Sequence, residues 1–218
     1  MQHGELLASG RDADVFALDE GRVLRRYRAG GDVTAEAAVM VHVGAHGYPV
    51  PIVFDARGTD LVMQRLDGPT MLQALAIGNL DELTAGELLG DLHNRLHLLP
   101  PRVSADPADR ILHLDLHPDN VMMCVHGPTV IDWRNSIEGS PDLDAGLSAL
   151  ILAETAVGNR KLSASARAVL EGFANRVDAS PTNELQQAVT LRQRDPNLTA
   201  REVARLQAAA ELVLGSCR

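Results

Sequence analysis

A polar segment in the middle of the chain carries residue types that could bind a divalent cation and move a proton. It reads HLDLHPDN over residues 113–120, and Asp132 follows after a short predicted hairpin. Polar side chains among apolar neighbours are costly to desolvate unless they have partners or a function. The spacing of Asp115, Asn120 and Asp132 can place a base and two oxygen ligands around one Mg²⁺, which prefers hard oxygen donors.

The same residues allow two other interpretations. Asp and Asn are favoured in turns and caps whatever the function, so Asp115, Asn120 and Asp132 could be purely structural. Alternatively His113, Asp115 and His117 alternate along the chain and could face one way as ligands of zinc or iron. No further His or Glu follows at a supporting spacing for such a site.

The pattern His-x-Asp-x-x-x-x-Asn with a later Asp-Trp resembles the catalytic loop and metal-binding aspartate of the kinase fold. The segments HLDLHPDNVMM and TVIDW are similar to the aminoglycoside phosphotransferase and choline kinase-like family, whereas protein kinases have Arg after the histidine and a later Asp-Phe-Gly. The resemblance implies that Asp115 accepts the proton of the substrate hydroxyl and that His113 braces the loop. It also implies that Asn120 and Asp132 hold magnesium and that Asp144 supports the loop.

The N-terminal part fits the same resemblance, with two departures. Residues 9–15, with the single glycine Gly10, take the place of the loop over the nucleotide phosphates, and Glu36 takes the place of the helical ion-pair partner of a lysine. That lysine is absent. Arg25 is its substitute, because strand alternation puts Arg26 on the opposite face. An arginine can pair with Glu36 and with phosphate oxygens, although it is bulkier than lysine.

The elements that must position these residues change in type along the chain. Short apolar runs with turns between them predict strands up to Gln64, and one helix over 33–46 interrupts them. Helical periodicity dominates after residue 68, with a second hairpin over 121–133. The predicted strands are 15–18, 22–27, 52–55 and 61–64, and the predicted helices are 33–46, 71–77, 84–99, 142–155, 161–177, 182–193 and 199–214.

This order predicts an α+β, two-lobed, protein-kinase-like fold with a small N-terminal antiparallel sheet, one helix and a larger helical C-terminal lobe. We expect one phosphotransferase domain over 1–218, with a nucleotide lobe at 1–64 and a catalytic and acceptor lobe at 65–218. Gln64 lies in the segment that would join the lobes, whose backbone receives the adenine edge in the family it resembles.

Composition limits the partners. The chain of 218 residues has a net charge of −9, which opposes non-specific binding to nucleic acid or anionic lipid. The two cysteines lack the spacing of a zinc site or of a disulfide framework, and no signal or membrane-spanning segment is recognised. These features predict a cytoplasmic protein. No obligate protein partner is evident. We expect ATP or GTP, Mg²⁺ and a small-molecule hydroxyl acceptor, and the alternative is a nucleotide- or small-molecule-binding protein of the same fold that has lost activity.

Overall fold

The computed structural model describes residues 4–10 and 12–217, so Arg11 of the predicted phosphate loop lies outside the described residues. The chain forms two compact units. The first, here called the N-terminal unit, contains Met1–Pro69 and Met122–Ser136. The second, the C-terminal unit, contains Thr70–Val121 and Ile137–Arg218.

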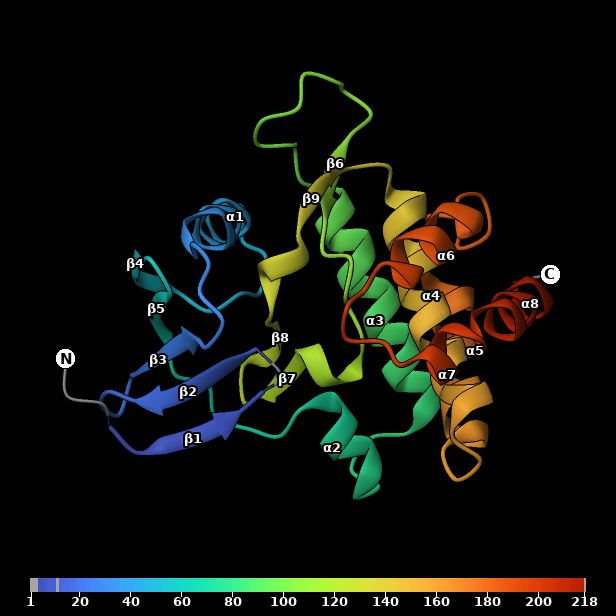
Figure 1. Ribbon diagram of the computed structural model, residues 1–218, viewed down its shortest axis with the longest axis horizontal. Helices are drawn as coiled ribbons and strands as arrows, with labels where there is room; N and C mark the ends of the chain where they lie inside the picture. Colours follow the sequence, from blue (N-terminus) through green and yellow to red (C-terminus); the bar gives the residue numbers. More distant parts are fainter. Residues whose placement is uncertain (1–3, 11, 218) are drawn as a thin grey trace. The chain divides into compact units, whose positions relative to one another are not determined.

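The N-terminal unit is built on a five-stranded antiparallel sheet in the order β1-β2-β3-β5-β4 (Figure 1). The side chain of Asp19 accepts the N–H of Gly21 and pairs with Arg22, which fixes the predicted turn between β2 and β3. The elements are β1 (Leu6–Ser9), β2 (Ala13–Ala17), β3 (Arg22–Tyr27), α1 (Thr34–Ala45), β4 (Val53–Arg57) and β5 (Asp60–Gln64).

A second hairpin, β7 (Val121–Cys124) and β8 (Gly127–Val130), leads into a 3₁₀ turn, η2 (Trp133–Asn135). The prediction that the second strand of this hairpin runs to Trp133 is wrong, because the strand ends at Val130. Asp132 has a φ of 66°, and this left-handed conformation cannot continue an extended strand. Trp133 is fully buried and donates from Nε1 to the carbonyl of Val130, so a packed indole holds the turn that follows Asp132.

The C-terminal unit is mainly helical (Figure 1). In it α3 packs on α5, and α4 packs on α5, α6 and α8. Most of α4 is buried, which explains why its sequence is apolar on every face. The elements are α2 (Met71–Ala76), α3 (Glu82–His97), β6 (Arg110–Leu112), η1 (Pro118–Asn120), β9 (Ile137–Gly139), α4 (Pro141–Gly158), α5 (Ser163–Arg176), α6 (Leu185–Gln193), α7 (Ala200–Val203) and α8 (Leu206–Ser216).

The crossing of α3 and α5 depends on two glycines. A Cβ added to Gly86 would lie 2.2 Å from the carbonyl oxygen of Val169, and one added to Gly172 would lie 2.3 Å from that of Leu83. Side chains larger than hydrogen would therefore force these two backbones apart. The close contact keeps α3 in place, and α3 carries His93 and His97, which matter below.

Two other differences from the predicted elements have local causes. The helix predicted over 199–214 is two helices, because the chain turns at Ala204 and Arg205 and the Arg205 side chain donates to the carbonyl of Gly158. The short antiparallel pair β6 and β9 is absent from the prediction, since three residues per strand leave no readable alternation. In the part of the chain described above, no helix has both the length and the apolar character needed to cross a membrane.

Candidate functional site

One guanidinium group connects three segments of the N-terminal unit. Nη1 of Arg25 donates to Oε1 of Glu36 at 2.7 Å, and Nη2 donates to Oδ1 of Asp132 at 2.5 Å. The Arg25 side chain is only 11% exposed, so these two carboxylates are its main environment. Arg25 on β3 thus ties α1 to the turn after β8; its pairing with Glu36 is the predicted one, whereas its pairing with Asp132 was not predicted.

Tyr27 is a further member of this cluster, and the sequence analysis did not identify it. Its hydroxyl donates to Oε2 of Glu36 at 2.6 Å, so both oxygens of the buried Glu36 carboxylate have partners. The guanidinium carbon of Arg25 lies 5.0 Å from the Tyr27 ring centroid, and that of Arg134 lies 4.5 Å from it. The alternation that puts Arg25 and Tyr27 on one face of β3 was a usable signal for this arrangement.

The carboxylates also determine the protonation of the cluster. Burial alone would lower the pKa of Arg25, but the charges of Asp132 and Glu36 raise it above its ordinary value. The pKa of the Tyr27 hydroxyl is raised by burial and by the Glu36 carboxylate. Arg25 therefore stays charged and Tyr27 stays a donor throughout the physiological pH range.

The predicted phosphate loop is held at its base. The N–H of Gly10 donates to the carbonyl of Ala13, which joins the residue after β1 to the first residue of β2. Arg28 donates to the carbonyl of Gly10 and pairs with Asp14. Asp12 pairs with Arg134 at 2.9 Å, so the loop contacts the residue that stacks on Tyr27.

Gln64 ends β5 at the edge of the segment predicted to receive a base. Its backbone N–H donates to the carbonyl of Ile52, and its side-chain oxygen accepts the N–H of Ile52 at 3.3 Å. Gln64 is thus fixed against the segment before β4. A role for it in nucleotide binding remains a prediction.

The C-terminal unit contains the polar segment 113–120. Asn120 is 8% exposed, and its Nδ2 donates to the carbonyl of Asp115 at 2.8 Å and to Oδ2 of the same residue at 3.3 Å. His113 is fully buried, and its Nδ1 accepts the N–H of Asp115 at 3.3 Å. The structure therefore brings together His113, Asp115 and Asn120, three of the predicted site residues, within one loop.

Asp144 holds the backbone of this loop from the start of α4. Its carboxylate is fully buried and accepts the N–H groups of His113 at 3.2 Å and Leu114 at 2.7 Å. Leu114 has a φ of 62°, a left-handed conformation that is costly for a leucine and needs such fixed partners. This placement agrees with the supporting role that the resemblance implies for Asp144.

Two histidines of α3 interact with the Asp144 carboxylate. Nε2 of His97 lies 2.9 Å from Oδ2 of Asp144. His93 is fully buried, with Nε2 at 2.9 Å from the Ser148 hydroxyl. Burial would raise the pKa of Asp144, but the His97 hydrogen bond and nearby histidines lower it overall. Burial lowers the pKa of His93 to about 4.

The donor chemistry fits magnesium better than zinc. Asn120 uses its amide nitrogen on Asp115, which leaves its carbonyl oxygen as a hard ligand, and Asp132 uses Oδ1 on Arg25. In residues 4–10 and 12–217 no group of three His, Cys, Asp or Glu side chains could hold a metal ion, which argues against the His113, Asp115 and His117 zinc or iron site. Asp132 belongs to the N-terminal unit and Asn120 to the C-terminal unit.

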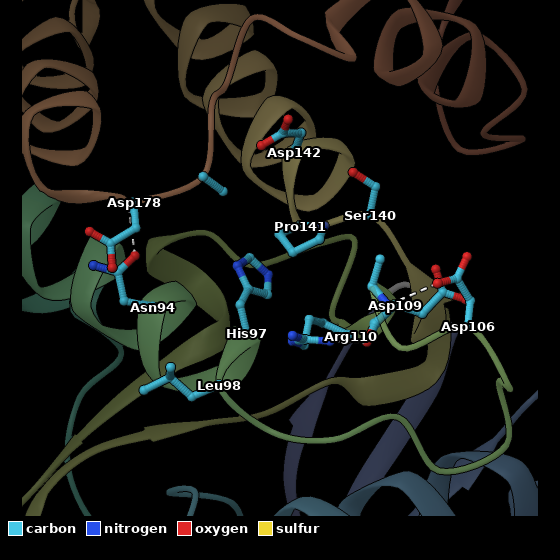
Figure 2. A pocket seen from close by; sticks show the side chains of 12 residues that line it. Asn94, His97, Leu98, Asp106, Asp109, Arg110, Ser140, Pro141, Asp142 and Asp178 are labelled. Atoms are coloured by element: carbon cyan, nitrogen blue, oxygen red, sulfur yellow. Dashed lines mark hydrogen bonds between the residues drawn. The ribbon is translucent and has the colours of Figure 1, made fainter.

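The C-terminal unit also contains an open cavity of about 600 Å³, drawn in Figure 2. His97 lines it together with Arg110 and several aspartates. These carboxylates hold the cavity walls: Asp109 accepts the Ser104 hydroxyl, and Asp142 accepts the N–H of Ser180. The residues that line this cavity include none of the predicted site residues.

A sequence model described as the phosphotransferase enzyme family matches residues 3–110. The predicted family resemblance is confirmed. The match covers Gly10, Arg25, Glu36 and Gln64 and ends before His113. The site residues predicted after position 110 therefore rest on their motif and not on this match. A search of curated proteins found no sequence match.

Solved structures of aminoglycoside phosphotransferases and of an amicoumacin kinase are similar in fold to this chain. Aminoglycoside phosphotransferase APH(4)-Ia has 15% identity and a TM-score of 0.55, covering 98% of this chain and 93% of that one. ADP-bound APH(2'')-Ib has 15% identity and a TM-score of 0.56, covering 98% and 95%. The amicoumacin kinase hAmiN, in complex with AMP-PNP, Ca²⁺ and Ami, has 12% identity and a TM-score of 0.58, covering 96% and 87%. The predicted kinase-like α+β fold is therefore confirmed.

Proposed function

We propose that this chain is an ATP-dependent phosphotransferase that moves the terminal phosphoryl group to a hydroxyl of a small molecule. The family match supports a phosphotransferase. The structures of relatives with AMP-PNP, one of them also with hygromycin B, support a nucleoside triphosphate as donor and a small-molecule acceptor for this chain. Its net charge of −9 disfavours nucleic acid as a partner.

The residues have separate tasks in this proposal. Asp115 accepts the proton of the attacking hydroxyl, and His113 and Asp144 fix the backbone from which Asp115 projects. Asn120 and Asp132 are the proposed magnesium ligands, and the ion would offset the negative charge of the phosphates. Gly10, Arg25, Glu36 and Gln64 are the proposed nucleotide-side residues, with Arg25 supplying positive charge in place of a lysine.

One observation carries the proposal more than any other. Nδ2 of Asn120 contacts both the backbone carbonyl and the carboxylate of Asp115. The proposed base and a proposed metal ligand are thus fixed relative to each other inside one loop. Positioning of this kind supplies much of the catalysis in phosphoryl transfer, where the protein itself does little covalent chemistry.

The decisive variant is Asp115→Asn, which keeps the shape of the side chain but removes the proton acceptor. We expect it to abolish ATP-dependent phosphorylation while ATP binding, measured by calorimetry, stays within about twofold. Asp119→Asn is the matched control, because Asp119 is an exposed aspartate of the same loop that accepts a hydrogen bond from Thr70. Full turnover by Asp115→Asn would refute the assignment of the base.

The acceptor has to be found before that experiment. A library of small hydroxyl compounds, screened for ADP release with ATP and with GTP as donors, tests activity and acceptor together. Amine-bearing acceptors are a reasonable first set because the chain is acidic.

A second candidate is a nucleotide-binding protein without transfer activity. It is favoured by one observation: the group in the place of the lysine, Arg25, has its two terminal nitrogens on carboxylates. Stabilisation of the chain by ATP and Mg²⁺ without any phosphorylated product across the library would favour this candidate. Stabilisation with transfer would favour the enzyme.

A further inference from the structure

The positive charge beside Asp132 in this structure is the guanidinium group of Arg25. Nη2 of Arg25 donates to Oδ1 of Asp132 at 2.5 Å, and the guanidinium is mostly buried while the Asp132 side chain is 41% exposed. The two charges therefore interact in a region only partly screened by water, where an ion pair is stronger than at an open surface. Asp132 is accessible, but one of its two oxygens is already occupied.

Arg25 is also held firmly on its other side. Nη1 donates to Oε1 of Glu36, whose second oxygen accepts the Tyr27 hydroxyl, and the Glu36 side chain is 4% exposed. A buried carboxylate with a charged partner is costly to separate from it. Glu36 therefore holds the Arg25 guanidinium beside Asp132 more firmly than a free surface arginine would be held.

We propose that Arg25 competes with a divalent cation for Asp132, so that cation binding to this chain is weakened until the Arg25–Asp132 ion pair opens. This inference rests on the proposed function, in which Asp132 is a metal ligand. It adds to that function, because arginine in the place of the lysine then raises the cation concentration that is needed to occupy the site at Asp132. The two terminal nitrogens of the Arg25 guanidinium bind Glu36 and Asp132 at the same time. Arg25 therefore stays next to Asp132 and continues to compete with the cation.

The test measures cation binding directly and needs no turnover. Mn²⁺ alone serves as the probe, and the free ion is followed by electron paramagnetic resonance during titration of the full-length protein. The variant Arg25→Gln removes the competing charge. A charge within ~4–6 Å changes the affinity of a carboxylate for a proton by about ten- to a thousandfold, so we expect Mn²⁺ to bind at least about tenfold more tightly.

The adjacent arginine provides the matched control. Arg26 lies on the same strand but pairs with Asp60, so Arg26→Gln removes the same charge without freeing Asp132. We expect its Mn²⁺ affinity to equal that of the wild type. Asp132→Asn should abolish the binding that Arg25→Gln gains.

Arg25→Gln leaves the buried Glu36 carboxylate without its cation. The double variant Arg25→Gln/Glu36→Gln is therefore measured as well, with Glu36→Gln as its reference. A rise in Mn²⁺ affinity of the double variant over that reference supports the proposal. Unchanged or weaker Mn²⁺ binding after loss of Arg25 overturns it, as does a gain that survives Asp132→Asn. ATP binding in the presence of EDTA, measured on the same proteins, tests the nucleotide part of the proposed function separately.

Discussion

Nε2 of His97, near the end of α3, lies 2.9 Å from Oδ2 of Asp144, and the Asp144 carboxylate accepts the N–H of Leu114 at 2.7 Å. A histidine distant in sequence thus orients the carboxylate that fixes the loop bearing Asp115. The loop conformation includes a left-handed leucine, so it depends on this support.

The first prediction concerns that support. Asp144→Ala should leave the N–H groups of His113 and Leu114 without acceptors, at a cost of roughly 1–3 kcal/mol for each buried group. Hydrogen–deuterium exchange measured by mass spectrometry should be faster in a peptide covering residues 111–116 by about tenfold or more. Asp142→Ala is the control, since Asp142 accepts hydrogen bonds from Ser180 and Asn183 instead. Equal protection of this peptide in wild type and Asp144→Ala would contradict the role of Asp144.

The second prediction is a pH dependence that arises from His93. Its pKa is lowered to about 4 by burial, from an ordinary value near 6.5 in the unfolded chain. The unfolded state therefore binds a proton between those values while the folded state does not, and the free energy of unfolding falls as the pH drops from 6.5 to 4. The loss attributable to His93 is about 3 kcal/mol.

Urea unfolding at pH 7.5 and pH 4.5 measures this effect. His93→Gln should lose much of the pH dependence, whereas His126→Gln, which changes an exposed histidine, should keep it. An identical slope of stability against pH in wild type and His93→Gln would show that His93 is not the responsible group.

The third prediction concerns the crossing of α3 and α5. Gly172→Ala would put a Cβ 2.3 Å from the carbonyl oxygen of Leu83, so the helices must separate. We expect a loss of about 1–3 kcal/mol in the free energy of unfolding. Gly215→Ala, on an open face of α8, should be neutral or stabilising by up to about 1 kcal/mol, because alanine favours the helix. Denaturant titration of the two variants distinguishes them, and equal effects would argue against the close crossing.

The fourth prediction compares the two arginines of β3 as nucleotide contacts. Arg25 contacts Glu36 and Asp132, whereas Arg26 pairs with Asp60. We expect Arg25→Ala to weaken ATP binding, measured by calorimetry in EDTA, by about tenfold or more, because it removes a charge that attracts phosphate. Arg26→Ala should change it less than Arg25→Ala does. The opposite order would reject the assignment of Arg25 to the nucleotide side.

The sequence predicted well what is local. The alternation of side chains along β3 predicted that Arg25 and Arg26 lie on opposite faces, and they do bind different partners. Turn and cap residues predicted the bounds of most helices and hairpins to within a few residues. The motif HLDLHPDN identified a loop in which Asp115 contacts both His113 and Asn120. These features depend on neighbours a few residues away, so a single sequence contains them.

The rest depends on contacts between distant segments. The positive φ of Asp132 occurs between a fully buried Trp133 and an ion pair with Arg25, neither of which a strand pattern reveals. The roles of His93 and His97 could not be read from the sequence, because periodicity cannot tell a buried histidine with partners from an exposed one. Their partners, Ser148 and Asp144, lie on another helix.

The presence of arginine instead of lysine at position 25 also limits which chemical probes can label this protein. Lys161 is the chain's only lysine and lies between α4 and α5, so the N-terminal unit has no side-chain amine. Nucleotide probes that acylate a lysine beside the phosphates would find no such target on β3. Surveys that detect kinases by such labelling would therefore miss this chain even when it binds the probe.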